Sequence, residues 1–212
     1  MATHLDDEEE LQKIKTWWKE NWLALVGGLV IGFGAIGGWE GYKNWKNARA
    51  EAASQLYVDL SVHLRSGEME QSEAIVSTLK AEYSGTPYAA AGALALAGTQ
   101  VEAANLDQAV SSLGWVIDNA DDDGMVEAAR LRKARLLFAQ QKHDEALGLL
   151  KSGANGFASL YSELRGDIQL AKGERDAART AYEEALSQAE VDARNRNLLQ
   201  QKLDDLAVGA AS

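Results

Sequence analysis

The chain has 212 residues, 46% of them hydrophobic, and a formal net charge of -11. This acidic balance argues against nucleic acid as a partner, because neutralising phosphates needs a basic face. The absence of cysteine excludes disulfides, thiol nucleophiles and zinc–thiolate sites, and leaves the redox compartment open. A single proline, with abundant alanine and leucine, favours an all-α fold.

An uncharged stretch near the N-terminus predicts a membrane span. Residues 21–39 lie between Glu20 and Glu40 without a charge. At about 1.5 Å per residue, a helix over 22–39 is roughly 27 Å long, close to the roughly 30 Å of bilayer hydrocarbon. Aromatic residues flank the stretch on both sides, as in a belt at headgroup depth: Trp17, Trp18, Trp22, Trp39, Tyr42 and Trp45. We predict a transmembrane helix over 21–40, preceded by a short acidic, lysine-containing tail over 1–20.

Three alternatives for this segment are a cleaved signal peptide, an interfacial helix and a buried core helix. The apolar run is longer than a signal peptide needs and ends without a small-x-small cleavage site. It has no polar face, which an interfacial helix requires, and aromatic bracketing is not a feature of core helices. Cleavage remains the main rival to an uncleaved anchor.

Small residues recur along the predicted span at spacings that allow another membrane helix to approach closely. The candidate packing positions are Ala24, Gly28, Gly32, Gly34 and Gly38. Residues 32–37 also spell G-x-G-x-x-G, but a dinucleotide pyrophosphate would then sit in hydrocarbon, so no nucleotide cofactor is predicted.

Charge does not orient the span. Three basic residues precede it and three follow it, so the positive-inside rule is tied. The two sets are Lys13, Lys15 and Lys19, and Lys43, Lys46 and Arg49.

After the span, one sequence unit recurs as a helical hairpin. Its clearest copy is 164–186, in which Gly166 and Ala178 mark a close approach of two helices, Gly173 closes the turn, and Tyr182 and Ala185 pack under the next unit. This spacing resembles a tetratricopeptide repeat. The small position of the second helix recurs at Ala146, Ala109 and Ala74, at intervals near 34 residues, and that of the first helix at Ala97 and Ala134.

The pattern predicts an α-solenoid of about four helix pairs, within a domain spanning 41–207. First helices are expected near 50–65, 88–102, 126–140 and 158–171, and their partners near 68–83, 106–119, 144–151 and 174–189. A capping helix is expected over 192–207, with apolar residues at Leu198, Leu199, Leu203 and Leu206. Residues 208–212 are expected to be a frayed tail.

Such an array binds other proteins and does not usually catalyse. Repeat positions place seven residues toward the concave side, with core packing an equally open reading for each: Leu94, Val101, Leu131, Arg135, Phe138, Glu163 and Leu170. They lack the Lys/Asn set with which clamp-type relatives grip a peptide carboxylate.

No metal, cofactor or catalytic site is predicted. His4, His63 and His143 are far apart in sequence. Residues 119–124 imitate the start of a calcium loop, but Arg130 stands where a glutamate ligand is needed, so an N-cap aspartate explains them better.

The acidic tail, the glycine-rich anchor 28–39 ending in Trp39, and four divergent repeats ending in 164–186 resemble the YfgM family of Gram-negative bacteria. The resemblance implies an inner-membrane protein with a cytoplasmic N-terminus and a periplasmic repeat domain. It also implies an ancillary subunit of the Sec translocon that works beside the membrane-anchored foldase PpiD and periplasmic chaperones.

Two functional hypotheses follow. In the first, the protein is a non-enzymatic translocon scaffold that aids handover of secretory proteins. In the second, it is an envelope-stress signalling adaptor whose cytoplasmic residues 6–10 bind a basic response regulator.

Overall fold

The computed structural model describes residues 3–151, 156–188 and 193–208. The chain divides into two compact units, Met1–Arg49 and Ala50–Ser212. Within the described ranges all regular structure is helical, with nine helices and no strand, which confirms the all-α prediction.

Helix α1 (Thr3–Ser66) is a single helix where the sequence predicted two, over 21–40 and 50–65. The intervening residues 41–49 contain no proline to interrupt the helical hydrogen bonds. In the first unit, the side chains of the apolar stretch are exposed, and its most apolar 18-residue window has a mean hydropathy of 1.7 with none of it buried. Of the described helices, α1 alone is long and apolar enough to cross a membrane.

Aromatic rings at the end of the apolar stretch contact one another in steps of three residues. The ring centroids of Trp39 and Tyr42 lie 6.3 Å apart, and those of Tyr42 and Trp45 lie 6.1 Å apart. The guanidinium of Arg49 lies 4.9 Å from the Trp45 ring centroid. These amphipathic rings form one of the two flanks predicted for the membrane boundary.

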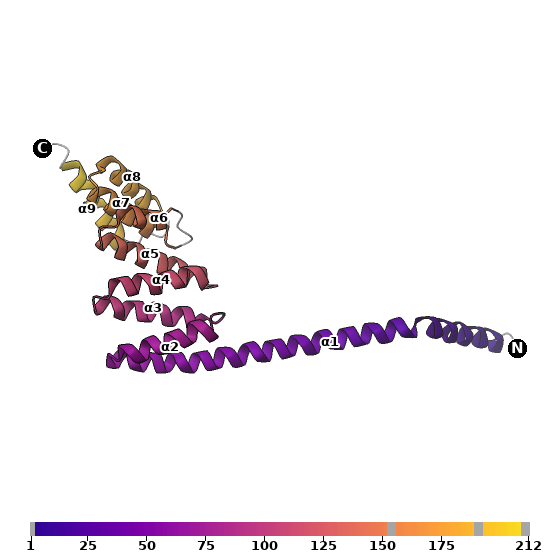
Figure 1. Ribbon diagram of the computed structural model, residues 1–212. Helices are drawn as coiled ribbons and strands as arrows, with labels where there is room; N and C mark the ends of the chain where they lie inside the picture. The colour runs from indigo at the N-terminus through magenta and orange to yellow at the C-terminus, as the bar shows by residue number, and fades with distance from the viewer. Residues whose placement is uncertain (1–2, 152–155, 189–192, 209–212) are drawn as a thin grey trace. The chain divides into compact units, whose positions relative to one another are not determined.

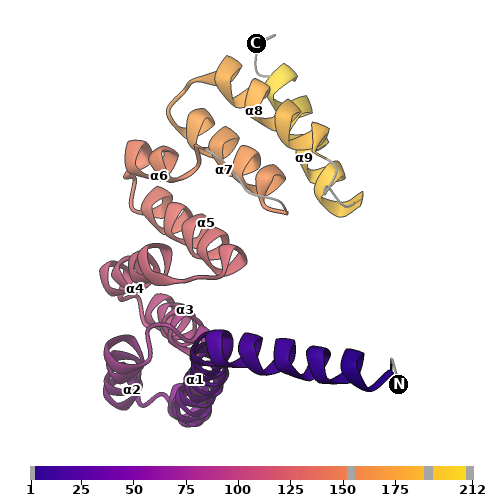
Figure 2. The same ribbon diagram turned by 90° about the vertical axis from the view of Figure 1, so that its right-hand side faces the viewer.

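The second unit consists of consecutive helical hairpins followed by one further helix, stacked in chain order (Figures 1 and 2). Residues 50–66 of α1 precede α2. The other helices are α2 (Met69–Glu82), α3 (Pro87–Glu102), α4 (Leu106–Asn119), α5 (Asp123–Ala139), α6 (His143–Leu149), α7 (Ala158–Ala171), α8 (Arg175–Ser187) and α9 (Ala193–Val208). The predicted hairpins and capping helix are therefore present, with the ends of the predicted helices displaced by a few residues.

All four hairpins turn in the same way. The residue two before each second helix is in the left-handed region: Gly67, Ala104, Gln141 and Gly173, with φ of 73°, 60°, 62° and 81°. In each turn, the residue after the left-handed one donates its backbone N–H to the carbonyl of the residue five positions before it. The N–H of Glu174, for example, donates to the Gln169 carbonyl at 2.8 Å. Gly173 closes its turn as predicted, whereas two other turns hold side chains in a conformation that favours glycine.

Small residues lie fully buried near the start of each second helix. Ala109, Ala146 and Ala178 are each 0% exposed, as their repeat positions predicted. The prediction of Ala74 for the first repeat is wrong: Ala74 is exposed, and the buried small residue is Ser72, three residues into α2 as the others are in their helices. The Ser72 hydroxyl donates to the Glu68 carbonyl at 2.8 Å, which satisfies it inside the core.

The core is a series of clusters along the stack. The first joins Leu60, Val76, Leu79, Leu96 and Leu113 from α1 to α4. The second is built mainly from α5 to α7, and the third from α8 and α9. Each hairpin buries its apolar face against its neighbours, so the stack as a whole supplies the core.

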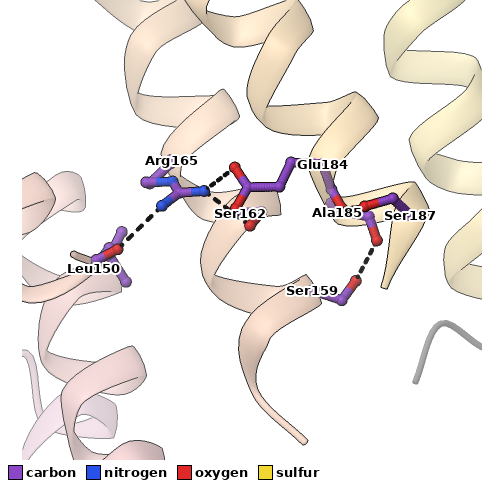
Figure 3. A network of polar contacts seen from close by, with 7 residues as sticks. All are labelled: Leu150, Ser159, Ser162, Arg165, Glu184, Ala185 and Ser187. Atoms are coloured by element: carbon purple, nitrogen blue, oxygen red, sulfur yellow. Dashed lines mark hydrogen bonds and ion pairs between the residues drawn. The ribbon is translucent and has the colours of Figure 1, made fainter. Parts of the chain in front are cut away.

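A polar network ties α6, α7 and α8 together (Figure 3). The guanidinium of Arg165 donates to the Leu150 carbonyl at 3.5 Å and to Ser162 Oγ at 2.9 Å, and pairs with the Glu184 carboxylate. Ser159 Oγ donates to the Ala185 carbonyl at 3.1 Å. One planar guanidinium on α7 therefore contacts its own helix, the C-cap residue of α6 and a carboxylate on α8.

Helix α9 covers the last hairpin through apolar and charged contacts. Leu199 and Leu206 are buried and Leu203 packs beside them, whereas Leu198 is 43% exposed and lies outside this apolar face. Lys202 Nζ donates to Glu163 at 2.8 Å and to Asp167 at 2.6 Å. Although burial of the ammonium opposes it, these two carboxylates keep the pKa of Lys202 above its usual range.

Candidate binding groove

A groove of about 450 Å³ lies between α3 and α5, with α4 contributing to its lining. Its surface is mostly apolar. Leu94, Ala97, Leu113 and Leu136 supply most of the apolar side chains, and Ala97 and Leu113 are themselves almost completely buried. The remaining lining residues are Gly98, Val101, Glu102, Arg132 and Arg135. The local cause of this hollow is residue size, since alanine and glycine at 97 and 98 leave space that a larger side chain would fill.

Three of the seven residues that repeat positions placed on the concave side line this groove: Leu94, Val101 and Arg135. The other four are placed elsewhere. Leu131 is 4% exposed and belongs to the core, and the ring of Phe138 lies 5.6 Å from that of His143. Glu163 pairs with Lys202, and Leu170 is 39% exposed on α7.

The groove also contains residues that the sequence analysis did not select, notably Gly98 and Arg132. Arg132 precedes Arg135 by three residues on α5, so the two side chains share one face of that helix. This spacing was a usable signal. Gly98 follows directly on Ala97, whose repeat position did predict close packing.

The two arginines of the groove have no ion-pair partner in the described part of the chain. Both are exposed, and neither guanidinium takes part in a hydrogen bond or salt bridge there. Arg130, two residues before Arg132 and outside the groove, pairs with Glu127 at 3.7 Å. The groove therefore combines apolar surface with two available guanidiniums, while Glu102 is the one acidic residue among its lining.

A second hollow, of about 290 Å³, lies among α2, α3 and α4 and is more polar. Its buried amide, Gln100, accepts from Ser112 Oγ at 2.9 Å and donates to Glu73 at 3.5 Å. Lys80 Nζ lies 5.3 Å from the ring centroid of Trp115, and burial lowers the pKa of this ammonium. These groups satisfy one another, which indicates a structural role.

Comparison with known proteins assigns the family. A tetratricopeptide repeat-like domain family matches residues 15–208, which include the apolar stretch and all the hairpins. The ancillary SecYEG translocon subunit of Neisseria gonorrhoeae is 32% identical over 211 residues, covering 97% of this chain and 100% of the relative. The chain belongs to this family. The proteins of the same name from Aggregatibacter actinomycetemcomitans and Escherichia coli are 30% and 26% identical, over 97% and 98% of this chain and 100% of each relative.

The family assignment confirms the resemblance stated from the sequence and agrees with the tetratricopeptide-like fold. The relatives are named as ancillary translocon subunits, and in this chain the apolar stretch and the groove are the two candidate interaction sites. At Gly28, Gly32, Gly34 and Gly38, an added Cβ would meet nothing within 4 Å in the described chain. Together with Ala24 they remain a predicted surface for another membrane helix.

The acidic residues 6–10 of the tail lie within α1, but their side chains fall outside those that the structure describes. The predicted frayed tail falls, beyond Val208, outside the described residues.

The described residues offer no cluster of three or more His, Cys, Asp or Glu side chains that could hold a metal ion. The acidic loop before α5 instead caps that helix. Asp122 Oδ1 accepts from the Met125 N–H at 2.8 Å, which satisfies one of the free donors of the first turn.

Proposed function

We propose that this protein is a non-enzymatic scaffold of the bacterial inner membrane that associates with the SecYEG translocon. In this proposal, α1 crosses the membrane once, with the N-terminus in the cytoplasm and the repeat unit in the periplasm. The repeat unit links the translocon to the membrane-anchored foldase PpiD and to periplasmic chaperones, and aids handover of secretory proteins.

The observation that carries the proposal is the extent of the family match. The relatives align over 97–98% of the chain, so the alignment includes the apolar stretch as well as the hairpins. A protein that acted only after recruitment from solution would not need to share this apolar stretch with its relatives. The shared plan therefore supports a function exercised at the membrane, beside the complex for which the relatives are named.

The apolar stretch supports a lateral contact within the membrane. Lipid is as apolar as leucine, so membrane helices associate through close packing of small residues. Gly28 and Gly32 are one helical turn apart and have free space around them. We propose that this glycine face meets a membrane helix of the translocon.

Affinity purification from mild detergent tests the proposal. The full-length chain, tagged at its C-terminus, should recover translocon subunits, and Gly28→Leu with Gly32→Leu should recover fewer. Gly37→Leu is the matched control, because residue 37 lies on the opposite side of the helix from residue 28. Absence of translocon subunits from the wild-type eluate would contradict the proposal, and equal recovery with both variants would contradict the glycine-face contact.

Accessibility to a membrane-impermeant reagent tests the orientation. The wild-type chain contains no cysteine, so a cysteine introduced at exposed Gln71 would be its single reactive thiol. The proposed orientation predicts labelling of this thiol from the periplasmic side of intact cells. Labelling of the thiol only after the inner membrane is opened would indicate the opposite orientation.

A further inference from the structure

We infer that the groove between α3 and α5 binds an acidic amphipathic helix-forming segment of an emerging secretory chain. This inference rests on the proposed function, because that function supplies the class of polypeptide that reaches the groove. The form and charge of the segment follow from the groove itself.

The volume of the groove matches side chains rather than a whole folded element. A helix with its side chains is about 10–12 Å across, so a groove of about 450 Å³ accommodates apolar side chains from one helical face. Leu94, Leu113 and Leu136 offer such side chains an apolar lining. Two leucines one turn apart on the partner would remove this surface from water.

The backbone around the groove indicates a helical partner. All the lining residues lie in α3, α4 and α5 beyond the first turn of each helix, so their N–H groups are committed to helical hydrogen bonds. The groove therefore has no free edge to which an extended peptide could add as a strand. A helix satisfies its own backbone groups and can bury apolar side chains without leaving them unpaired.

The charges at the rim select an acidic partner. Arg132 and Arg135 are exposed, form no ion pair in the described part of the chain, and lie three residues apart on one helix. Carboxylates three or four residues apart on a partner helix share a similar spacing. In a chain of net charge -11, two unpaired guanidiniums beside apolar surface are a local exception to the overall charge. Glu102 leaves the rim with a net positive charge.

Gly98 provides a way to fill the groove without disturbing its walls. An added Cβ at this position would meet nothing within 4 Å, and the residue is exposed on α3. A leucine there would occupy the space offered to the partner's side chains. Helix α3 itself should be retained, because leucine is a better helix former than glycine.

The experiment measures fluorescence anisotropy of labelled synthetic peptides with the full-length protein in detergent micelles. The probe is an amphipathic peptide with leucines one turn apart and glutamates on either side of them. A second peptide has lysine at every glutamate position, and a third has central prolines that prevent a helix. We expect the glutamate peptide to bind, with an affinity that falls as salt rises, and the other two to bind at least about fivefold more weakly.

Protein variants locate the binding. Arg135→Glu should weaken the glutamate peptide about fivefold or more, and Arg132→Glu with Arg135→Glu should weaken it further. Arg179→Glu, on the exposed surface of α8, is the matched charge control and should leave binding unchanged. Gly98→Leu should abolish binding, whereas Gly148→Leu, at an exposed helical glycine with equally free space, should not.

Several results would overturn the inference. Equal binding of the lysine peptide would remove the role of the arginines, and equal binding of the proline peptide would remove the helix. Self-association that Arg135→Glu disrupts would identify a second copy of this chain as the occupant. Affinity purification of the Arg132→Glu, Arg135→Glu double variant separates the two proposals. If this variant still recovers translocon subunits, the proposed scaffold function stands whether or not the groove binds the peptide.

Discussion

The ring of Tyr182 on α8 lies directly against the backbone of Gly166 on α7. An added Cβ at residue 166 would lie within 3.0 Å of three atoms of this ring, and the Tyr182 hydroxyl donates to Asp167 Oδ1 at 2.8 Å. Tyr182 is 1% exposed, so its ring has no free space into which to withdraw. The repeat thus requires glycine at one helix because its partner helix carries a tyrosine.

Gly166→Ala should destabilise the last hairpin. Overpacking a buried contact costs about 1–3 kcal/mol, whereas Gly148→Ala, at an open helical position, should gain about 0.8–1 kcal/mol from helix propensity. We expect hydrogen exchange of α7 and α8 to accelerate in the first variant and not in the second. Similar exchange in both variants would show that the ring can move away from residue 166.

Ala104→Gly and Gln141→Gly should each stabilise the repeat unit. Both residues occupy the left-handed turn position at which the other hairpins have Gly67 and Gly173. Relief of the side-chain strain should outweigh the added freedom of the unfolded chain, leaving a net gain of about 0.5–1 kcal/mol. The denaturation midpoint of the full-length protein should rise. Ala74→Gly, inside α2, is the control and should lower it.

Ser72→Leu and Ala74→Leu test the register of the first repeat. Ser72 is 0% exposed beside Val76 and Leu79, so a larger side chain would need space that the core lacks. We expect a loss of about 1–3 kcal/mol for Ser72→Leu and a change within about 0.5 kcal/mol for exposed Ala74→Leu. The reverse order of denaturation midpoints would restore the register first inferred from the sequence.

Two buried tyrosines should ionise late. Burial raises the pKa of Tyr161, and Glu127 adds to the effect; burial likewise raises the pKa of Tyr182, helped by the carboxylate of Asp167. A folded-state pKa above the unfolded value means that the stability contribution is complete below about pH 10 and is lost as the pH rises further.

Ultraviolet titration of phenolate absorbance checks this prediction. In the wild-type protein, Tyr161 and Tyr182 should contribute to the phenolate absorbance only above about pH 10, as the protein unfolds. Tyr161→Phe and Tyr182→Phe should therefore each lack part of the absorbance increase above that pH. A missing step centred near pH 10 in either variant would contradict the burial of that hydroxyl.

The helical hairpins were predictable because repeat spacing reports local packing. Gly173 indicated the turn between two helices, and Ala109, Ala146 and Ala178 indicated close helix contacts, all of which the structure has. The first repeat was misaligned because its small residue is a serine, and because Leu60 occupies the position that Ala97 and Ala134 hold in later copies. In the first repeat, Gly92 provides the space for Leu60. A Cβ added at residue 92 would lie 3.1 Å from the Leu60 side chain and 3.0 Å from that of Leu79.

The groove was only partly predictable. The position of a residue in the repeat indicates on which helix face it lies. It does not indicate where the first helices of two successive repeats are far enough apart to leave a hollow. That separation depends on the size of residues from two successive repeats, including Gly98 on α3 and Leu136 on α5. Leu131, at a similar predicted position, is instead buried in the core.

Site-specific photocrosslinking from α1 in intact membranes tests the central claim most directly, namely that this helix holds the repeat unit beside the translocon. A photoreactive residue replacing Ala24 or Ala35 would probe the glycine face without removing a glycine, because both positions lie on the same helical face as Gly28. We expect covalent adducts with subunits of the SecYEG translocon from position 24, and fewer from Leu29→photoreactive residue on another face. Efficient membrane insertion with no translocon adduct from any of these positions would contradict the account.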